Sequence, residues 1–392
     1  MAEEFSFFTN DAEARFVRRP NRFLIIAAAD KQELSCHCPN PGRLIEFVFP
    51  GARLILEKRE DPSATAGAQA KAKTGWTVVG LYYRDGVAPL FSSRANKAAE
   101  KLILKAIIPS LKEIIPEYTL GPSRFDFLCV DARGRKHLVE VKACSLVEQG
   151  VAMFPDAPSG RALKHLEELA ELSSRGYRCH VLFVVTHGNP AVFIPNLHTD
   201  PEFAAALSRH RRAVAVHAAL LRCDSTGRTS LVSAALPVDR SHGKLAESNS
   251  GNYLILLELA EEQRIEVGAL GTIHFKAGWY VYAGSARKNL SQRVNRHLRR
   301  QRKQQHWHLD YLTPHAARGV GKLKALPILS YRNLECDLAG ELANLGGEPV
   351  PRFGSSDCKC ASHLYYFRAP PLGSREFVDM LLRYRHVEGL RR

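Results

Sequence analysis

The sequence lacks any uninterrupted apolar run near the roughly 20 residues that a membrane-spanning helix needs. Its start, Met1 to Glu4, is acidic, whereas a secretory signal begins with basic residues followed by an apolar stretch. The nine cysteines are an odd number scattered over 392 residues, which does not suit a disulfide framework. These absences argue against a membrane partner and predict a cytoplasmic protein with reduced thiols.

The composition is that of an ordinary folded chain with a basic excess. Hydrophobic residues make up 45% and charged residues 24%, and 55 Lys and Arg against 40 Asp and Glu give a net charge of +15. At about 100–200 residues per domain, the length predicts two or three domains. An excess of this size predicts a polyanionic partner such as nucleic acid.

The positive charge is concentrated toward the C-terminus. Residues 241–392 carry 23 basic and 14 acidic side chains, whereas residues 1–240 carry 32 and 26. Between these parts, residues 239–250 are polar, contain glycine and show no apolar periodicity, which is typical of a linker. We therefore place the main domain boundary there, with a C-terminal domain over 251–392.

The N-terminal part changes pattern near residue 85. Up to there, short apolar runs alternate with Pro, Gly and Asn, which predicts a small β-barrel or sandwich over 1–85. Over 86–238 the pattern predicts an α/β core with a mixed sheet. Its expected elements are a helix at 95–111, strands at 124–130 and 137–142 joined by a turn, a helix at 161–173 and a buried strand at 179–185.

The two strands joined by a turn carry the first candidate site. Period-2 alternation places Glu140 and Lys142 on one face of the second strand, and Asp126 can reach that face from the first. Two carboxylates and an ammonium suit a divalent metal and phosphodiester hydrolysis. Glu100, on the preceding helix, could add an acidic ligand. The alternative is an exposed salt bridge, but the flanking residues are apolar, which favours a site within the core strands.

Several long motifs resemble the sugar fermentation stimulation protein family, SfsA, over about residues 10–235. They are VRRPNRF at 17–23, CHCPNPGRLIE at 36–46, GPSRFDF at 121–127 and LVEVKACSLVEQGVAMFPDAPSGRALKHLEEL at 138–169. The resemblance implies an N-terminal OB-like barrel that binds nucleic acid, followed by a domain similar to the PD-(D/E)xK nucleases. It also implies roles for Asp126 as metal-binding aspartate, for Glu140 and Lys142 as the E-x-K pair, and for Glu100 as the acidic residue of the first core helix. The implied cofactor is Mg²⁺ or Mn²⁺.

Basic residues near these motifs are candidates for phosphate contact. Arg161, Lys164 and His165 lie within about one helical turn, which fits either a phosphate-facing helix start or a solvated helix face. Asn40 to Arg43 predict a tight turn that leaves Arg43 available to phosphate. Arg22, in the first motif, is a further nucleic-acid-binding candidate.

The C-terminal domain combines apolar strands with a basic helix. Strands are expected near 254–257 and 280–284, and a helix over 285–303 has Leu and Val on one stripe and Arg on another. No acidic residue occurs between Ala286 and Leu309, so this helix is predicted to bind nucleic acid with a strong salt dependence. The candidate contacts are Arg287, Lys288, Arg296, Arg300 and Lys303.

The order Gly-x-Tyr, Tyr-x-Gly and GSARKNLSQRVNRHL resembles the GIY-YIG nuclease module over about residues 250–370. HWHLDYL at 306–312 and FGSSDCKCASHLYYF at 353–367 are similar to an uncharacterised family related to it. The implied roles are Tyr253 and Tyr282 beside the attacking water, Arg293 at the scissile phosphate, His297 as proton-handling partner, and Glu335 as metal ligand with Glu341 as the alternative.

Other interpretations of this second candidate site stay open. The two tyrosine motifs are 29 positions apart, wider than in compact members of the module, so a domain that binds without catalysis is an alternative. Buried core tyrosines with hydrogen-bonded hydroxyls are the plain structural reading of Tyr253 and Tyr282. The cysteine motifs 36–38 and 358–363 lack the usual two-residue spacing, so buried thiols are expected rather than structural Zn²⁺.

The sequence thus predicts a multidomain α/β (α+β) protein that acts on DNA or RNA. The favoured hypothesis is a metal-dependent endonuclease centred on Asp126, Glu140 and Lys142. The alternative is a non-catalytic DNA-binding regulator of sugar (maltose-type) metabolism genes with inactive nuclease folds. The sequence does not predict the oligomeric state.

Overall fold

The computed structural model describes residues 5–59, 74–84, 86–301, 304–319 and 321–391. The chain divides into two compact units, Met1–Gly243 and Lys244–Arg392, which are described separately. Across the described ranges, no helix has both the length and the apolar character needed to cross a membrane. The segment 239–250, expected to be a linker, contains the short helix α5 (Gly243–Ser248).

The first unit begins with an OB-like five-strand barrel. Strand order is β4-β3-β2-β5-β6, and β4 also pairs with β6, which closes the barrel. Its interior is filled by apolar side chains that include Ile25, Cys36, Leu54 and Val78. The strands are β2 (Ala12–Asn21), β3 (Leu24–Ala29), β4 (Gln32–His37), β5 (Arg53–Lys58) and β6 (Trp76–Tyr83).

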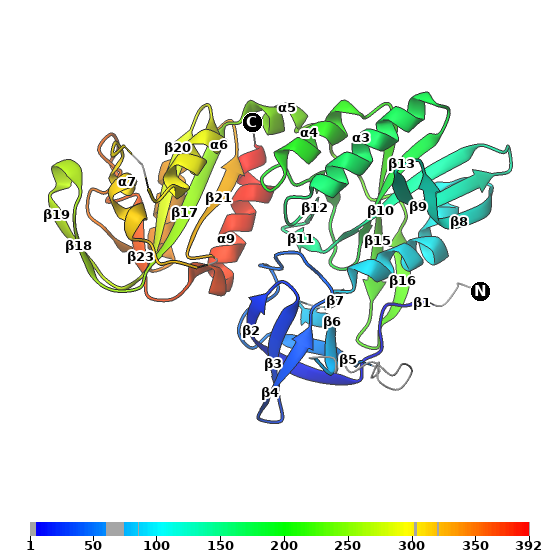
Figure 1. The fold of residues 1–392 in the computed structure, drawn as a ribbon, viewed down its shortest axis with the longest axis horizontal. Coiled ribbons are helices and arrows are strands. Elements are labelled where there is room, and N and C mark those ends of the chain that lie inside the picture. Colours follow the sequence, from blue (N-terminus) through cyan, green and yellow to red (C-terminus); the bar gives the residue numbers. More distant parts are fainter. Residues whose placement is uncertain (1–4, 60–73, 85, 302–303, 320, 392) are drawn as a thin grey trace. The chain divides into compact units, whose positions relative to one another are not determined.

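A mixed sheet continues from the barrel in the order β7-β15-β13-β10-β9-β8 (Figure 1). Strands β15, β13 and β10 are parallel, whereas β10, β9 and β8 are antiparallel. The strands are β7 (Gly86–Pro89), β8 (Leu111–Leu120), β9 (Ser123–Asp131), β10 (Lys136–Cys144), β13 (Arg178–Val185) and β15 (Val214–Cys223). At the edge, β15 also pairs with β16 (Arg228–Ser233), which pairs with β1 (Phe5–Ser6).

Two cores cover the two faces of this sheet. On one face, α3 (Gly160–Ser174) and α4 (Pro201–Arg209) pack beside each other (Figure 1). On the other face lies a helical segment made of α1 (Ala95–Ala98), the π-helical turn η3 (Ala99–Ile103) and α2 (Leu104–Ile107). A small sheet of β11 (Leu146–Glu148), β12 (Val151–Phe154) and β14 (Val192–Pro195) completes the unit.

The second unit is built on an antiparallel sheet of order β21-β17-β20-β23-β22. A separate hairpin, β18 (Gln263–Glu266) and β19 (Thr272–Phe275), lies between β17 and β20 in the chain. This insertion accounts for the wide spacing of the two tyrosine motifs. The sheet strands are β17 (Gly251–Leu259), β20 (Gly278–Ala286), β21 (Leu323–Leu329), β22 (Glu348–Pro349) and β23 (Leu364–Phe367).

Helices of the second unit include α6 (Leu290–Leu298), α7 (His308–Leu312), α8 (Glu335–Asn344) and α9 (Arg375–His386). Two predicted helices are shorter than expected. The helix predicted over 95–111 ends at Ile107, because Leu111 begins β8. The helix predicted over 285–303 is limited to Leu290–Leu298, because Ser285 and Ala286 belong to β20 and pair with β17.

Candidate functional site

The candidate site of the first unit lies at the point where the β9–β10 ladder ends. The last backbone pair is Val139 with Phe127. Beyond it, the Asp126 carboxylate accepts a hydrogen bond from the Val141 backbone N–H, with Oδ2 2.7 Å from the nitrogen. Residues two positions apart in a regular strand point to the same face of the sheet. Phe127, however, packs in the core beside the α1–α2 segment, and Phe125 packs in the core beside α3 and α4. The regular alternation of side chains is therefore interrupted at Asp126. The interruption turns this carboxylate toward the neighbouring strand.

Glu140 and Lys142 lie on the same face of β10, as their spacing predicts. The Lys142 ammonium forms an ion pair with Oε1 of Glu140. The same oxygen lies 2.5 Å from Nδ1 of His165 on α3. Glu140 is only 3% exposed, and its Oε2 has no hydrogen-bond partner among the described residues. Because a buried carboxylate oxygen without a partner is costly, this oxygen is available to a cation.

The pKa values of the two carboxylates are shifted in opposite directions. Burial, followed by the negative charge of Glu140, raises the pKa of Asp126. Burial also opposes ionisation of Glu140, but the hydrogen bond from His165 and the charge of Lys142 outweigh it and lower the Glu140 pKa. A buried carboxylate whose pKa is raised by a neighbouring carboxylate is typical of a functional site.

The helical segment before the hairpin contributes Asn96, which the sequence analysis missed. Its side-chain Nδ2 donates to Oδ1 of Asp126 at 2.7 Å. Glu100, the predicted acidic residue, follows one turn later and is half-buried. Within the described part of the chain, no hydrogen bond links Glu100 to Asp126 or Glu140. Asn96 precedes Glu100 by four residues, and this spacing places the two side chains on the same face of a helix. The spacing could therefore have identified Asn96 as a candidate.

The three basic residues of α3 separate into two groups. Arg161 and Lys164 are exposed, and Lys164 lies 3.7 Å from the carboxylate of Glu168. His165 is buried, because it shares the apolar stripe of Ala162, Leu166, Leu169 and Leu172 that faces the sheet. The interpretation of His165 as part of a phosphate-facing helix start is therefore wrong, since its ring contacts Glu140 instead.

The Asn40–Arg43 segment forms a turn stabilised by its own asparagine. The Asn40 Oδ1 accepts from the Gly42 N–H at 2.9 Å. A Cβ on Gly42 would lie 1.9 Å from Oδ2 of Asp156, so only glycine permits this approach. Arg43 is exposed, as is Arg22, whose guanidinium lies 4.9 Å from the ring centre of Phe23. Both arginines are thus accessible to a ligand.

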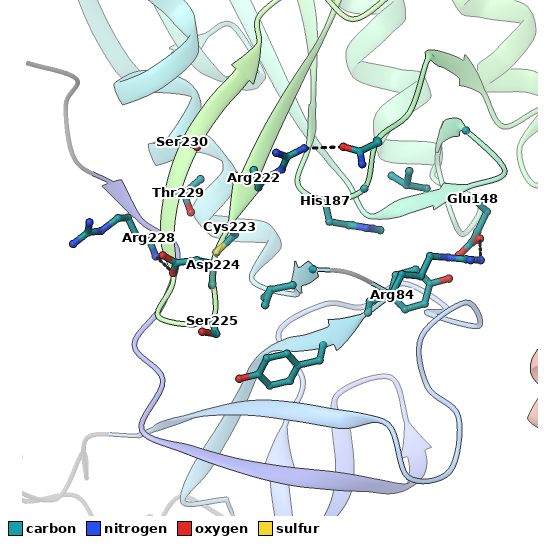
Figure 2. Close-up of a pocket in the computed structure, with 18 of the residues that line it drawn as sticks. Arg84, Glu148, His187, Arg222, Cys223, Asp224, Ser225, Arg228, Thr229 and Ser230 are labelled. Atoms are coloured by element: carbon teal, nitrogen blue, oxygen red, sulfur yellow. Dashed lines mark hydrogen bonds and ion pairs between the residues drawn. The ribbon is translucent and has the colours of Figure 1, made fainter.

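A cavity of about 1170 Å³ lies elsewhere in the first unit, between the barrel strand β6 and the edge strands β15 and β16 (Figure 2). No predicted site residue lines it. Two of its arginines have partners in its wall: Arg84 pairs with Glu148 at 2.6 Å and Arg222 donates to Asn189 at 2.7 Å. The cavity is therefore separate from the carboxylate–lysine cluster.

The tyrosine motifs of the second unit meet across β17 and β20. Tyr253 lies opposite Gly284 in the ladder, and a Cβ on Gly284 would be 2.4 Å from Cζ of Tyr253. The Y-x-G pattern therefore leaves room for the first tyrosine ring. The ring centres of Tyr253 and Tyr282 are 6.5 Å apart, and burial raises the pKa of both hydroxyls.

His297 connects this tyrosine pair to a buried aspartate. Its Nε2 lies 3.0 Å from the Tyr253 hydroxyl, and its Nδ1 lies 3.7 Å from Oδ1 of Asp310. Asp310 accepts a hydrogen bond from Arg296 at 2.7 Å. Asp310 was not among the predicted site residues, although it lies in the HWHLDYL motif.

Glu335 lies at the start of α8 beside the end of β20. One of its oxygens accepts from the Ser285 hydroxyl at 2.5 Å, and the other lies 3.0 Å from Nδ1 of His363. Burial opposes ionisation of Glu335, but the hydrogen bonds from His363 and Ser285 prevail and lower its pKa. Glu341 instead pairs with Arg383 at 2.6 Å, so the structure brings Glu335, rather than Glu341, to this cluster.

Arg293 reaches the same end of β20. It donates to the Ser285 carbonyl at 3.0 Å and lies 4.8 Å from the ring centre of Trp307. Some of the basic residues predicted to contact nucleic acid instead bind groups within the unit. Arg296 pairs with Asp310, and Arg300 donates to the carbonyls of Ala316 and Ala317. Arg287 and Lys288 are exposed before α6. Lys303 lies outside the described residues.

Comparisons with known proteins match the three parts of the chain. The SfsA N-terminal OB domain matches residues 17–88, and the sugar fermentation stimulation protein RE domain matches 93–227. Residues 252–384 match a domain of unknown function, DUF123. The sugar fermentation stimulation protein homolog of Clostridium tetani is 34% identical over 219 residues, which cover 55% of this chain and 91% of the relative. The homolog of Pyrobaculum arsenaticum is 35% identical over 231 residues, which cover 58% of this chain and 94% of the relative.

A solved structure supports the same assignment. The structure of Pyrococcus furiosus SfsA in complex with Ca²⁺ aligns with a TM-score of 0.52 and 27% identity, and covers 60% of this chain and 99% of that one. Fold and site together define a mixed α+β protein in which an OB-like barrel precedes a mixed sheet with a buried carboxylate–lysine cluster. The chain belongs to the sugar fermentation stimulation protein family, SfsA, and carries a DUF123 domain after the family's two domains.

Proposed function

We propose that this protein is a metal-dependent nuclease that hydrolyses phosphodiester bonds of DNA or RNA. The observation that carries the proposal is the convergence of Asp126, Glu140 and Lys142 at the end of the β9–β10 ladder. Both carboxylates are mostly buried, and the negative charge of Glu140 raises the pKa of Asp126. A protein that only binds nucleic acid has little reason to bury two acidic groups together, because their repulsion and desolvation are unfavourable.

The donor set fits a hard divalent cation. Asp126 and Glu140 would hold Mg²⁺ or Mn²⁺ through carboxylate oxygens, the ligands that such ions prefer. The Oε2 of Glu140, which has no hydrogen-bond partner in the described part of the chain, supports this assignment, and a relative was solved with Ca²⁺. When bound, such an ion supplies Lewis-acid activation of a phosphoryl oxygen and of water.

The remaining residues prepare this centre from the protein side. Lys142 places a positive charge beside Glu140, where it can neutralise charge that develops on a phosphoryl group. Asn96 and the Val141 N–H hold the two oxygens of Asp126 in place. His165 holds Glu140 from the helix side and favours its ionised form. Glu100 would join as an outer acidic residue.

The OB-like barrel and the exposed basic residues would bind the nucleic acid. OB barrels track single strands through basic grooves and stacked bases. In the first unit, Arg22, Arg43, Arg161 and Lys164 are exposed and available for phosphate contact. In the second unit, Arg287 and Lys288 are exposed. Phosphate contacts position a duplex or strand and carry no sequence preference by themselves.

The second unit has a specific arrangement that supports a second centre of GIY-YIG type. Four elements contribute its residues, which are Tyr253, Tyr282, His297, Arg293 and Glu335. The charges of Arg293 and Glu335 both influence the pKa of the Tyr253 hydroxyl. Glu335 would be the metal ligand of this centre and Arg293 its phosphate contact. We propose this unit as a nucleic-acid-binding module and assign the main cleavage activity to the first unit.

The test uses the full chain with labelled single- and double-stranded DNA and RNA in the presence of Mg²⁺ or Mn²⁺. We expect Asp126→Asn, Glu140→Gln and Lys142→Ala each to reduce cleavage at least about 100-fold while binding persists. Calorimetric titration with Ca²⁺ gives a second readout, since Asp126→Asn and Glu140→Gln should abolish binding at the first unit. The matched control is Glu167→Gln, an exposed α3 carboxylate that pairs with His210.

Two results would contradict the proposal. One is an absence of cleavage across all metals and substrates, with Glu140→Gln indistinguishable from the parent protein. The other is cleavage that survives Asp126→Asn and Glu140→Gln together, which would assign it to the second unit. The first result, combined with tight and sequence-selective DNA binding, would favour a non-catalytic regulator of sugar metabolism genes.

A further inference from the structure

Four soft ligand atoms meet in the second unit at a place that the proposed nuclease chemistry does not use. They belong to Cys336 on α8 and to Cys358, Cys360 and His363 in the segment before β23, and all lie within 4.8 Å of one another. The Nε2 of His363 is 3.3 Å from Sγ of Cys358 and 3.9 Å from Sγ of Cys336. Three thiolates and one imidazole form a common ligand set of closed structural zinc sites.

The spacing of these atoms fits a tetrahedral ion. With Zn–S near 2.3 Å and Zn–N near 2.0 Å, tetrahedral ligands lie about 3.5–3.8 Å apart. The two sulfur–nitrogen distances, 3.3 and 3.9 Å, lie on either side of that range. Small side-chain adjustments therefore suffice to bring all four atoms to one ion.

The orientation of His363 is that of a metal ligand. Its Nδ1 faces Oε1 of Glu335 at 3.0 Å, so Nε2 is the nitrogen that points to the sulfurs. Histidines that bind metals usually donate their other ring N–H to a carboxylate, which fixes the tautomer and the ring plane. His363 is 2% exposed, so its ring is held in this orientation by packing as well.

The three cysteines of the cluster differ from the other six in their exposure to solvent. Cys36, Cys38, Cys129, Cys144, Cys179 and Cys223 are buried, whereas Cys336, Cys358 and Cys360 are at least partly accessible. Three accessible thiols side by side oxidise readily unless something binds them. The segment 350–363 that carries two of them is built mainly of turns, and the cluster joins it to Cys336 at the start of α8.

We propose that Cys336, Cys358, Cys360 and His363 bind one structural Zn²⁺ ion. The ion ties the start of α8 to the segment that leads into β23. Through His363 it also fixes the carboxylate of Glu335, which makes His363 a positioning residue for that group. Zinc was not expected from the sequence, because the CKCASH motif lacks the usual two-residue cysteine spacing. The fourth ligand, Cys336, is remote from this motif in the chain, and only the fold brings it near.

The test begins with the full chain, purified under reducing conditions without chelator. Elemental analysis should give about one zinc per chain, and a mercurial reagent that modifies thiols should release it. Cys336→Ser and Cys358→Ser should each lose the ion, whereas His363→Cys should keep it, because four thiolates also bind zinc. Lys359→Ala is the matched control, since this exposed residue lies between two ligands but offers no ligand atom.

A second measurement keeps the test decisive if a serine variant fails to fold. Cobalt added to the metal-free parent protein, to Lys359→Ala and to His363→Cys should produce the visible absorption of thiolate-bound Co²⁺. Zinc removal from the parent by a chelator should lower its melting temperature by several degrees, and added zinc should restore it. A metal-free protein with unchanged melting temperature, or a disulfide between two of the three cysteines in freshly purified protein, would overturn the proposal. None of these readouts depends on nuclease activity.

Discussion

The Nδ1 of His165 lies 2.5 Å from Oε1 of Glu140, so α3 holds the central carboxylate of β10 directly. The contact joins a helix stripe otherwise made of Ala and Leu to a strand residue that is nearly fully buried. Glu140 is therefore held on two sides, by His165 and by Lys142, with one oxygen remaining for a ligand.

Replacing His165 tests whether it positions Glu140. The hydrogen bond from His165 favours ionised Glu140, so its removal should raise the Glu140 pKa. In His165→Ala, Ca²⁺ binding should then weaken about 10–100-fold, and its loss on acidification should begin at a higher pH than in the parent protein. Titrations with Ca²⁺ across a pH series measure both effects. His210→Ala is the control, because it removes an imidazole that pairs with Glu167 at the surface. If His165→Ala lost Ca²⁺ on acidification at the same pH as the parent protein, the positioning role would be refuted.

Salt dependence tests the exposed basic residues of the second unit. If the protein neutralises about six phosphates, the logarithm of its affinity should fall with the logarithm of salt concentration at a slope near −5. The double variant Arg287→Ala, Lys288→Ala should make that slope less steep by about 1–2. Fluorescence anisotropy with a labelled oligonucleotide gives the slopes. Lys276→Ala, which removes a lysine that pairs with Glu348, should leave the slope unchanged; equal slopes for all three proteins would remove these two residues from the interface.

Gly284→Ala tests the packing of the tyrosine motif. The added Cβ would lie 2.4 Å from Cζ of the buried Tyr253 ring, so we expect the second unit to lose about 1–3 kcal/mol of unfolding free energy. Urea unfolding can be followed by Trp279 and Trp307 fluorescence in a Trp76→Phe background.

Gly340→Ala is the matched control for this substitution. Gly340 lies within α8, and apart from the helix backbone and its chain neighbours no described atom lies within 4 Å of an added Cβ, so the change should be neutral or stabilising by up to about 1 kcal/mol. Equal stability of Gly284→Ala and the parent protein would mean that the ring of Tyr253 moves aside without cost.

A chain of histidines makes the first unit sensitive to acid. His137, His180 and His217 lie on adjacent strands with ring nitrogens 3.0 Å apart, and Asp131 lies 3.3 Å from His137. Burial, followed by the charges of His217 and His137, lowers the pKa of His180 to about 3. The folded state therefore holds neutral His180. The contribution of neutral His180 to the stability of the folded state is complete above pH 6.5, the ordinary pKa of histidine. This contribution is lost as the pH falls from 6.5 toward 3, because the unfolded state binds a proton in this range and the folded state does not.

The expected result is a loss of about 1 kcal/mol from His180 between pH 7.5 and 5.5. Unfolding of the first unit, followed by Trp76 fluorescence in a background that lacks the other tryptophans, measures this loss. His180→Gln should be less stable at pH 7.5 but should show a smaller change between the two pH values. His274→Gln alters an exposed histidine of the second unit and serves as the control. An unchanged pH dependence in His180→Gln would assign the acid sensitivity to other groups.

Local patterns predicted most elements around the first site. The β9–β10 hairpin, α3 and β13 lie close to the predicted ranges, because strand alternation and the helix stripe depend on neighbouring residues. The helix predicted over 285–303 was too long at its C-terminal end, because the extended Arg299 ends α6 although Arg299 and Arg300 continue its basic composition. Composition alone does not mark such an end when no capping residue is present.

The position of Glu140 and Lys142 on one face follows from the sequence alone, since the two-residue period of a strand requires it. The family also follows from the sequence, through motifs that do not depend on the fold. The distant side chains that complete each cluster could be identified only from the folded chain: Asn96 at Asp126, His165 at Glu140, and Cys336 beside His363. These contacts join separate elements, and the packing of those elements, rather than any local period, sets which of their side chains meet.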